Sequence, residues 1–393
     1  MLIEEKRGMT PLSVLSEPHE EFTDDKVLYT GRIANYKGIF NREEFLRIAP
    51  APWTVDFQLT AVCNHHCVFC SYDERNKHLQ KNKLDLVLKT HRELLEMGAR
   101  GIIYTGGGEP LSWRDGGMDL ADLIRSIDYG ENCKPSLVTN AVMLQKIINP
   151  DILRKMHFIA ISVYAHTPEL YKEVVKVNAF KAQTKNIKKL IQMKKDYNLK
   201  YPELNFKILI NRVNYKYLPE IYHFYKELGV EYIFMRCVNN FEEGQDVELS
   251  ELQKEELESL VRKKMDIGEE YVDDFLKSLL PSKDIKPASN CWTVKMGHNI
   301  LISTIGECSI EIPYGAKKEF CIGNINHNSL KEIWGSEQHL DVINKLNTQM
   351  QGLGCDLRMC RHHKYNKVMD AFLAGEVNAP DQSKFDMKHG YYL

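Results

Sequence analysis

The sequence predicts an α/β protein in which helices lie outside a parallel sheet. Strand-like and helix-like segments alternate from residue 54 onward, and six such βα units follow one another. The chemically distinctive motifs fall just after strands, where ligands bind in sheets of this kind. The expected strands cover residues 54–60, 101–105, 136–140, 158–164, 205–211 and 231–236.

The expected helices follow from apolar residues that recur every three or four positions. The segment 84–95 has this spacing, and Gly98 stands where a glycine would end the helix. The segment 218–228 has the same spacing and is followed by Gly229. A short helix is expected at 42–48, and a polar helical region at about 251–280.

Composition shifts divide the chain into four parts. Residues 1–50 form a polar lead-in, and residues 51–245 form the βα core. Residues 246–287 form a helical linker that ends near two prolines. Residues 288–393 are expected to be a small Cys-rich α+β domain with short strands.

The overall charge and hydropathy exclude several classes of protein. The chain has 393 residues, of which 43% are hydrophobic and 27% charged, and its formal net charge is -2. This charge balance argues against a nucleic-acid partner. The chain has no apolar run long enough to span a membrane, and its N-terminus lacks the features of a signal peptide. We therefore expect a cytoplasmic protein without a membrane partner.

Ten cysteines in a reducing compartment indicate metal sites rather than disulfides. Cys63, Cys67 and Cys70 follow the first strand with the spacing C-x3-C-x2-C. Three thiolates on one short loop can bind three corners of an iron–sulfur cluster and leave one iron open. A zinc site completed by His65 or His66 is the alternative.

A second motif, GGGEP, follows the second strand. Glycines allow backbone carbonyls to approach an ammonium group closely, and a glutamate adds a compensating charge. Taken alone, the motif is also an ordinary Gly-Pro turn. Its residues are Gly106, Gly107, Gly108, Glu109 and Pro110.

The two motifs together resemble those of the radical S-adenosylmethionine (SAM) enzymes, including the aromatic Phe69 before the third cysteine. The resemblance covers residues 50–240 and implies a partial (β/α)6 TIM-like barrel that binds SAM and a [4Fe–4S] cluster. In this family GGE binds the methionyl amino group of SAM. The resemblance also implies SAM contacts at two strand ends, where polar residues commonly just form turns. These strand-end candidates are Thr139, Asn140 and Ser162.

The segment 320–334 resembles part of the SPASM and twitch domains, which carry auxiliary iron–sulfur clusters. The full SPASM pattern has seven cysteines, whereas this region has five, so the resemblance implies one auxiliary [4Fe–4S] cluster. A structural zinc site is the alternative. The expected ligands are Cys291, Cys308, Cys355 and Cys360, with Cys321 as a substitute for one of them.

Two further cysteines lie in the βα core. Cys133 precedes the third strand and is expected to be a buried small hydrophobic residue. Cys237 follows the sixth strand and is either structural or a hydrogen-atom donor to a substrate radical, as some family members use. Strand alternation directs polar side chains into the barrel and favours a polar substrate. The candidate substrate contacts are Asp56, Gln58, Lys207 and Arg236.

The resemblance implies an enzyme that cleaves SAM to a 5′-deoxyadenosyl radical, which abstracts hydrogen from a polar substrate. Dehydrogenation or epimerisation of a sugar or aminocyclitol is the first expectation, since about 50 residues before the first strand are too few for a leader-peptide domain. Radical modification of a peptide is the alternative. A non-catalytic Fe–S electron-transfer protein would explain the cysteines but not GGGEP. The enzyme would need an electron donor such as flavodoxin or ferredoxin.

Overall fold

The structure is a computed structural model of the whole chain. It describes residues 13–14, 24–70, 80–230, 232–238, 246–268, 272, 275–276, 286–310, 318–351, 360 and 362–378. No helix in these ranges is long and apolar enough to cross a membrane.

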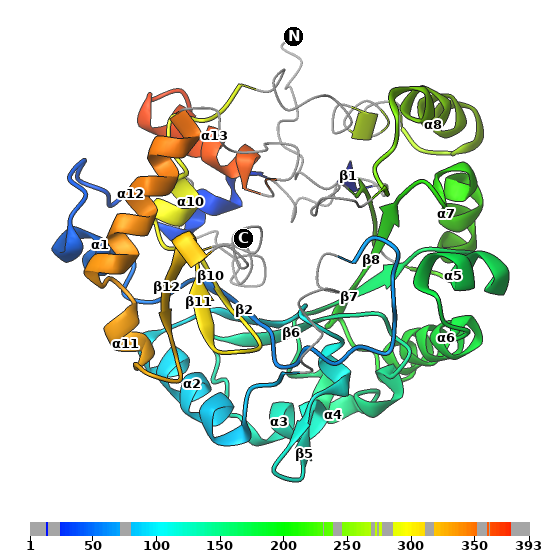
Figure 1. Cartoon of the computed structure of the whole chain (residues 1–393), viewed down its shortest axis with the longest axis horizontal. Coiled ribbons are helices and arrows are strands. Elements are labelled where there is room, and N and C mark those ends of the chain that lie inside the picture. Colours follow the sequence, from blue (N-terminus) through cyan, green and yellow to red (C-terminus); the bar gives the residue numbers. More distant parts are fainter. Residues whose placement is uncertain are drawn as a thin grey trace.

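Six parallel strands that follow one another in both sequence and space form the centre of the fold (Figure 1). Each pairs with the next in parallel register, so every connection crosses back over the outside of the sheet. The α/β class and the partial barrel are therefore confirmed. The strands are β2 (Thr54–Phe57), β3 (Gly101–Tyr104), β6 (Lys134–Thr139), β7 (Phe158–Val163), β8 (Glu203–Ile210) and β9 (Tyr232–Cys237).

The helices that connect these strands cover the outer face of the sheet (Figure 1). Gly98 ends the first of them in the left-handed conformation, with φ of 98°, as its position in the sequence predicts. The helices of this half are α2 (Leu84–Met97), α3 (Leu120–Ser126), α4 (Pro150–Leu153), α5 (Pro168–Val175), α6 (Phe180–Asp196), α7 (Leu218–Glu227) and α8 (Glu251–Lys264). Short 3-10 turns and a hairpin complete it: η4 (Pro110–Ser112), η5 (Leu144–Lys146), η6 (Tyr215–Tyr217), β4 (Arg114–Asp115) and β5 (Met118–Asp119).

The sheet continues through the region expected to be a separate C-terminal domain. The strand β10 (Asn299–Ile302) pairs in parallel with β2, and the antiparallel strands β11 (Glu307–Ser309) and β12 (Cys321–Asn324) follow it. The short strand β1 (Ser13–Val14) extends the other edge by pairing with β9. One ten-stranded sheet therefore spans both halves of the chain. Its pairing with β10 gives β2 a partner on both sides.

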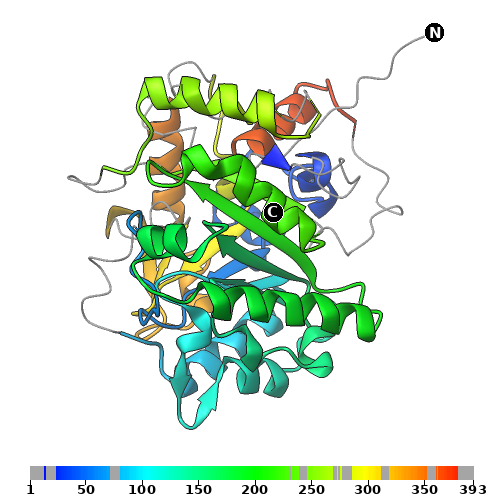
Figure 2. The ribbon, with the colours of Figure 1, turned by 90° about the vertical axis from the view of Figure 1, so that its right-hand side faces the viewer.

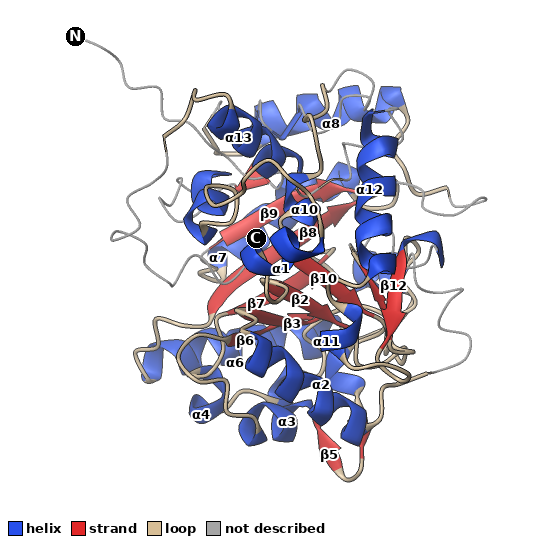
Figure 3. Cartoon of the chain, turned by 90° about the vertical axis from the view of Figure 1, so that its left-hand side faces the viewer, coloured by secondary structure: helices blue, strands red, loops and turns tan. Residues whose placement is uncertain are grey.

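The N-terminal and C-terminal elements gather on one side of the molecule (Figure 3). Arg32 donates to the backbone carbonyl of Met296 at 2.9 Å, and the Trp334 indole donates to that of Ala49 at 2.8 Å. These bonds fasten the lead-in to the C-terminal half. The elements are η2 (Asp24–Thr30), α1 (Arg42–Ile48), α10 (Trp292–Lys295), η9 (Lys318–Phe320), α11 (Leu330–Ile333), α12 (Glu337–Gln351) and α13 (His363–Leu373).

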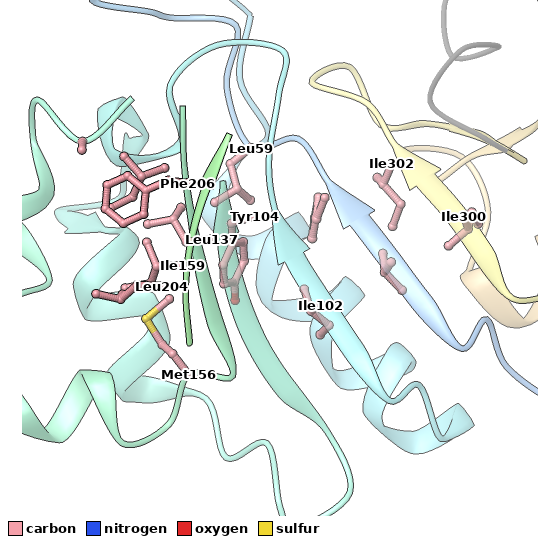
Figure 4. Packing of buried hydrophobic residues seen from close by; sticks show 14 of the residues in the cluster. Leu59, Ile102, Tyr104, Leu137, Met156, Ile159, Leu204, Phe206, Ile300 and Ile302 are labelled. Atoms are coloured by element: carbon pink, nitrogen blue, oxygen red, sulfur yellow. The ribbon is translucent and has the colours of Figure 1, made fainter. Parts of the chain in front are cut away.

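The main core lies between the sheet and its outer helices. Ile102, Tyr104 and Leu137 share one face of the sheet and are fully buried there (Figure 4). Phe57 lies opposite Tyr104 on the neighbouring strand and therefore shares this face. Phe57 stacks on His91 of α2 at 5.3 Å between ring centroids, which identifies this face as the one toward the helices. The residues between them along each strand therefore face the inside of the barrel.

Candidate active site

A pocket of about 330 Å³ opens at the C-terminal ends of the parallel strands. This volume lies within the range of about 300–1,000 Å³ that small-molecule sites occupy. Its lining combines the cysteine loop, the glycine motif and the ends of β6 to β9. The lining residues are Cys63, His65, Cys67, Phe69, Cys70, Thr105, Gly106, Gly108, Glu109, Val138, Thr139, Asn140, Ser162, Tyr164, Leu209, Arg236, Cys237 and Val238.

The cysteine loop is held by the end of α5. The backbone N–H groups of His66 and Val68 donate to the carbonyls of Val175 and Val174, each at 3.0 Å. The His65 Nε2 atom is hydrogen-bonded to the Tyr171 hydroxyl at 2.8 Å, whereas its buried Nδ1 atom has no hydrogen-bond partner among the described residues. The loop geometry therefore depends on a helix that lies about 100 residues further along the chain.

Cys63 lies in an environment that disfavours its charged form. Burial raises the pKa of Cys63 to about 11, the His65 backbone N–H partly offsets this, and the charges of Glu109 and Cys70 add to it. A thiolate ligand in such a pocket needs a nearby cation, which a bound metal supplies. Three half-buried thiols on one pocket wall thus fit a metal cluster with three protein ligands.

The glycine motif passes directly against the cysteine loop. A Cβ atom on Gly108 would lie 2.2 Å from the carbonyl oxygen of Val62, so only glycine fits there. The Glu109 N–H donates to that same carbonyl at 2.9 Å. Gly107 has φ of +78°, a conformation that favours glycine. These contacts bring the two sequence motifs together in one wall of the pocket.

Glu109 links the glycine motif to the end of β6. Its carboxylate accepts from the Thr139 hydroxyl at 2.7 Å and from the N–H groups of Asn140 and Leu111 at 2.8 and 3.2 Å. Burial raises its pKa, and the three donors partly offset that effect. The sequence predicted only a SAM contact for Glu109. Its hydrogen bonds to the end of β6 were not predicted.

A side chain of α6 holds the backbone at the ends of β6 and β7. The buried Gln183 donates to the backbone carbonyls of Asn140 and Ser162 at 2.8 and 3.2 Å. Asn140 in turn donates through its side chain to Asn64 at 2.6 Å, which connects β6 to the cysteine loop. Gln183 shares the buried face of α6 with apolar residues such as Phe180 and Ile187, and a polar residue at that position was the signal that could have identified it.

Aromatic rings close another side of the pocket. The ring of Phe69 lies 5.2 Å from that of Tyr164, which follows β7. Burial raises the pKa of Tyr164 well above its usual value, so the phenol stays neutral. Tyr164 was not among the predicted site residues, because an aromatic residue at the end of a buried strand is usually core.

Of the four predicted substrate contacts, one lines the pocket and three do not. Arg236 lines the pocket at the end of β9, next to Cys237. Asp56, Gln58 and Lys207 do not line it. Asp56 instead accepts a hydrogen bond from Asn299 of β10 at 3.2 Å, because β10 lies beside β2.

The described C-terminal cysteines include one at the start of α10 and two on the strands β11 and β12. Cys355, one of the predicted ligands, lies outside the described residues. Cys291 is buried at the start of α10, where its sulfur accepts from the Asn366 amide at 3.7 Å. Cys308 and Cys321 lie on neighbouring strands, and burial, then the charge of Cys321, raises the pKa of Cys308. In the described part of the chain, no three His, Cys, Asp or Glu residues are grouped to hold a single metal ion. Cys360 is half-buried, and Cys133 is buried in the core as predicted.

Fold and site together define a partial α/β barrel with a thiol-lined pocket at its strand ends. Residues 57–233 match the model of the Radical SAM superfamily. These residues, which are less than half of the chain, are similar to a radical SAM domain, and such a domain implies SAM and a [4Fe–4S] cluster as its cofactors. The thiol loop, the close-packed glycines and the buried pocket fit both groups.

Known relatives and solved structures are similar to different parts of the chain. A probable GTP 3′,8-cyclase of Methanocaldococcus jannaschii is 27% identical over 175 residues, which are 44% of this chain and 54% of that protein. The chain thus spans about half the length of this curated relative. The structure of SuiB of Streptococcus suis bound to SAM has a TM-score of 0.55 at 15% identity. The match covers 81% of this chain and 74% of the SuiB chain. The anSMEcpe structure with bound AdoMet has a TM-score of 0.53 at 15% identity. The match covers 87% of this chain and 99% of the anSMEcpe chain.

Proposed function

We propose that this protein is an enzyme that cleaves SAM reductively and abstracts a hydrogen atom from a polar substrate. The observation that carries the proposal is the single pocket shared by three thiols, the glycine motif and the ends of β6, β7 and β9. When bound, the cluster and SAM together supply the electron and the 5′-deoxyadenosyl radical, chemistry that acid–base side chains cannot provide.

The residues of the chain position the reactants and exclude water from them. Cys63, Cys67 and Cys70 would hold the cluster, and the backbone around Gly108 would bind the methionyl ammonium of SAM. Glu109 is 2% exposed, and its bonds to Thr139 and Asn140 keep the glycine motif and β6 at a constant spacing. A buried, braced site of this kind limits side reactions of a radical.

We propose a peptide as the substrate, ahead of the sugar or aminocyclitol that the sequence favoured. A structure of SuiB bound to the precursor peptide SuiA has a TM-score of 0.55 and covers 86% of this chain. Arg236 at the pocket wall would suit a carboxylate or a backbone carbonyl of such a peptide. GTP is the second candidate, because the relatives are described as probable GTP 3′,8-cyclases.

Anaerobic incubation of the reconstituted protein with SAM and dithionite tests the proposed activity. We expect 5′-deoxyadenosine and methionine in equal amounts, measured by liquid chromatography. A non-catalytic electron-transfer protein would form neither product. Candidate peptides, GTP and aminocyclitols can then be compared by mass spectrometry, with deuterium from substrate appearing in 5′-deoxyadenosine as the sign of the true substrate.

Cys237 is proposed as the donor that returns a hydrogen atom to the substrate radical, and one electron from the external donor and one proton would then convert its thiyl radical back to the thiol. Its thiol lines the pocket, and burial raises its pKa to about 12, which keeps the S–H bond intact at neutral pH. In a redox-neutral reaction, we expect Cys237→Ala to cleave SAM at about the normal rate but to lose the reduced product. Product analysis by mass spectrometry checks this, with Cys133→Ala as a buried control. Normal product from Cys237→Ala would remove it as a donor.

We also propose one auxiliary [4Fe–4S] cluster in the C-terminal half. Supporting it are the buried thiols of Cys291 and Cys308 and the half-buried Cys360. The proximity of Cys321 to Cys308 makes Cys321 a stronger candidate ligand than its place in the sequence suggested.

A further inference from the structure

The helices α5 and α6 carry a concentration of positive charge unlike that of the chain as a whole. Residues 168–196 contain eight lysines and three acidic residues, Glu169, Glu173 and Asp196, whereas the formal net charge of the whole chain is -2. The two helices lie next to each other on the outer surface of the barrel (Figures 1 and 2). We call four of these lysines, from α5 to the first half of α6, the α5–α6 basic patch: Lys172, Lys176, Lys181 and Lys185.

The positive charge of these two helices exceeds what their three acidic residues can neutralise. All four lysines are exposed, and none forms an ion pair with another residue that the structure describes. Some surface lysines elsewhere do form ion pairs, as in Lys81–Asp115 at 2.9 Å, Lys331–Glu96 at 2.9 Å and Lys345–Glu319 at 2.6 Å. An uncompensated patch of one sign attracts a partner of the opposite sign and raises its rate of association.

The two helices that carry the patch both contact the wall of the pocket. The last carbonyls of α5, at Val174 and Val175, hold the backbone of the cysteine loop. At the start of α6, Gln183 bonds the strand ends that line the same pocket. Lys172 and Lys176 flank the first contact, and Lys181 and Lys185 flank the second in sequence. A protein bound to this patch would therefore sit beside the loop that is expected to hold the cluster.

We propose that the α5–α6 basic patch is the docking surface for an acidic one-electron donor protein of the flavodoxin or ferredoxin type. This proposal rests on the proposed function, because only a SAM-cleaving enzyme needs such a donor. Each docking event passes one electron from the reduced donor to the cluster held by Cys63, Cys67 and Cys70, so the donor is oxidised by one electron and the cluster is reduced by one. Electron transfer falls steeply with distance, which favours a surface next to that loop.

The test compares two reductants and two charge-reversal variants of the full, reconstituted chain. Lys181→Glu/Lys185→Glu reverses charge within the patch. The matched control, Lys195→Glu/Lys200→Glu, makes the same change at exposed positions at and just beyond the C-terminal end of α6, with Lys195 about 21 Å along the helix axis from Lys181. We measure 5′-deoxyadenosine formation with dithionite and with a reduced acidic flavodoxin, together with the Kd for flavodoxin at low and high salt.

We expect the patch variant to raise the KM and Kd for flavodoxin about tenfold or more at low salt, while its rate with dithionite stays within twofold of the parent. High salt should reduce the difference. The control variant should change far less. Equal losses in both variants, or a loss with dithionite as well, would overturn the assignment. So would lysine-dependent binding of phosphatidylserine vesicles or duplex DNA without binding of flavodoxin.

The outcomes separate this proposal from the proposed function. If no reductant yields 5′-deoxyadenosine, the proposed activity fails, and the Kd measurements alone decide whether the patch binds flavodoxin. If dithionite supports the reaction but flavodoxin binds both variants equally, the activity stands and the docking surface is wrong.

Discussion

Replacement of Cys63, Cys67 and Cys70 by alanine should abolish 5′-deoxyadenosine formation. The three thiols share one pocket wall, and no other cysteine of the described chain except Cys237 lines that pocket. Without them the cluster loses every protein ligand, and no electron can reach SAM. We expect activity to fall to background and the iron content to drop by about one cluster per chain, measured by chromatography and by colorimetric iron assay.

Cys133→Ala is the matched control for the triple variant. Cys133 is 2% exposed and lies in the core, so its loss should cost about 1 kcal/mol in the free energy of unfolding and no iron. Iron that remains in the triple variant belongs to the proposed auxiliary cluster, and Cys308→Ala and Cys321→Ala should each release it. Production of 5′-deoxyadenosine by the triple variant would show that the radical centre lies elsewhere.

Gly108→Ala should have the second largest effect. The added Cβ would lie 2.2 Å from the carbonyl oxygen of Val62, and 2.6 Å from the carbonyl carbons of Ala61 and Val62. These are backbone atoms at the root of the cysteine loop, so the loop itself must move away. We expect at least a hundredfold loss of SAM cleavage and a decrease in unfolding free energy of about 1–3 kcal/mol, measured by activity assay and by denaturant titration.

Gly130→Ala distinguishes this steric effect from the general cost of replacing a glycine. Gly130 has φ of +61° but no atom within 4 Å of the added Cβ. Its replacement should therefore cost backbone strain of about 1 kcal/mol and leave activity unchanged. If Gly108→Ala retains normal SAM cleavage, the glycine motif does not need the close approach to the cysteine loop seen in the structure.

The strand order could be predicted because it depends on local patterns. Apolar runs bounded by Gly98 and Gly229 marked the βα units, and consecutive parallel strands with short crossovers have few alternative arrangements. The pairing of β10 with β2 could not be predicted in this way. It joins residues about 245 apart, and the four-residue strand NILI carries no information about its partner.

The cysteine and glycine motifs could be found for a similar reason: their chemistry depends on residue type and close spacing. The residues that position these two motifs could not be identified from the sequence. Gln183, Tyr164 and Tyr171 act through partners far away in the sequence, and each residue type is common in ordinary helices and strands. Glu109 was identified from its motif, but its bonds to Thr139 and Asn140 needed the end of β6 to be placed beside it.

The sequence by itself determined the α/β class, the order of the central strands and the two motifs that define the superfamily, because periodicity and motif spacing are local properties of the chain. Only the tertiary structure decided which strand ends meet at the pocket and that Arg236 lines it. The structure also decided that Asp56 accepts a hydrogen bond from Asn299 of β10 and that Cys321 and Cys308 lie on neighbouring strands. It also decided that the end of α5 holds the cysteine loop. The physical reason is that strand pairing and buried hydrogen bonds join residues far apart in sequence, and their energies depend on the whole fold.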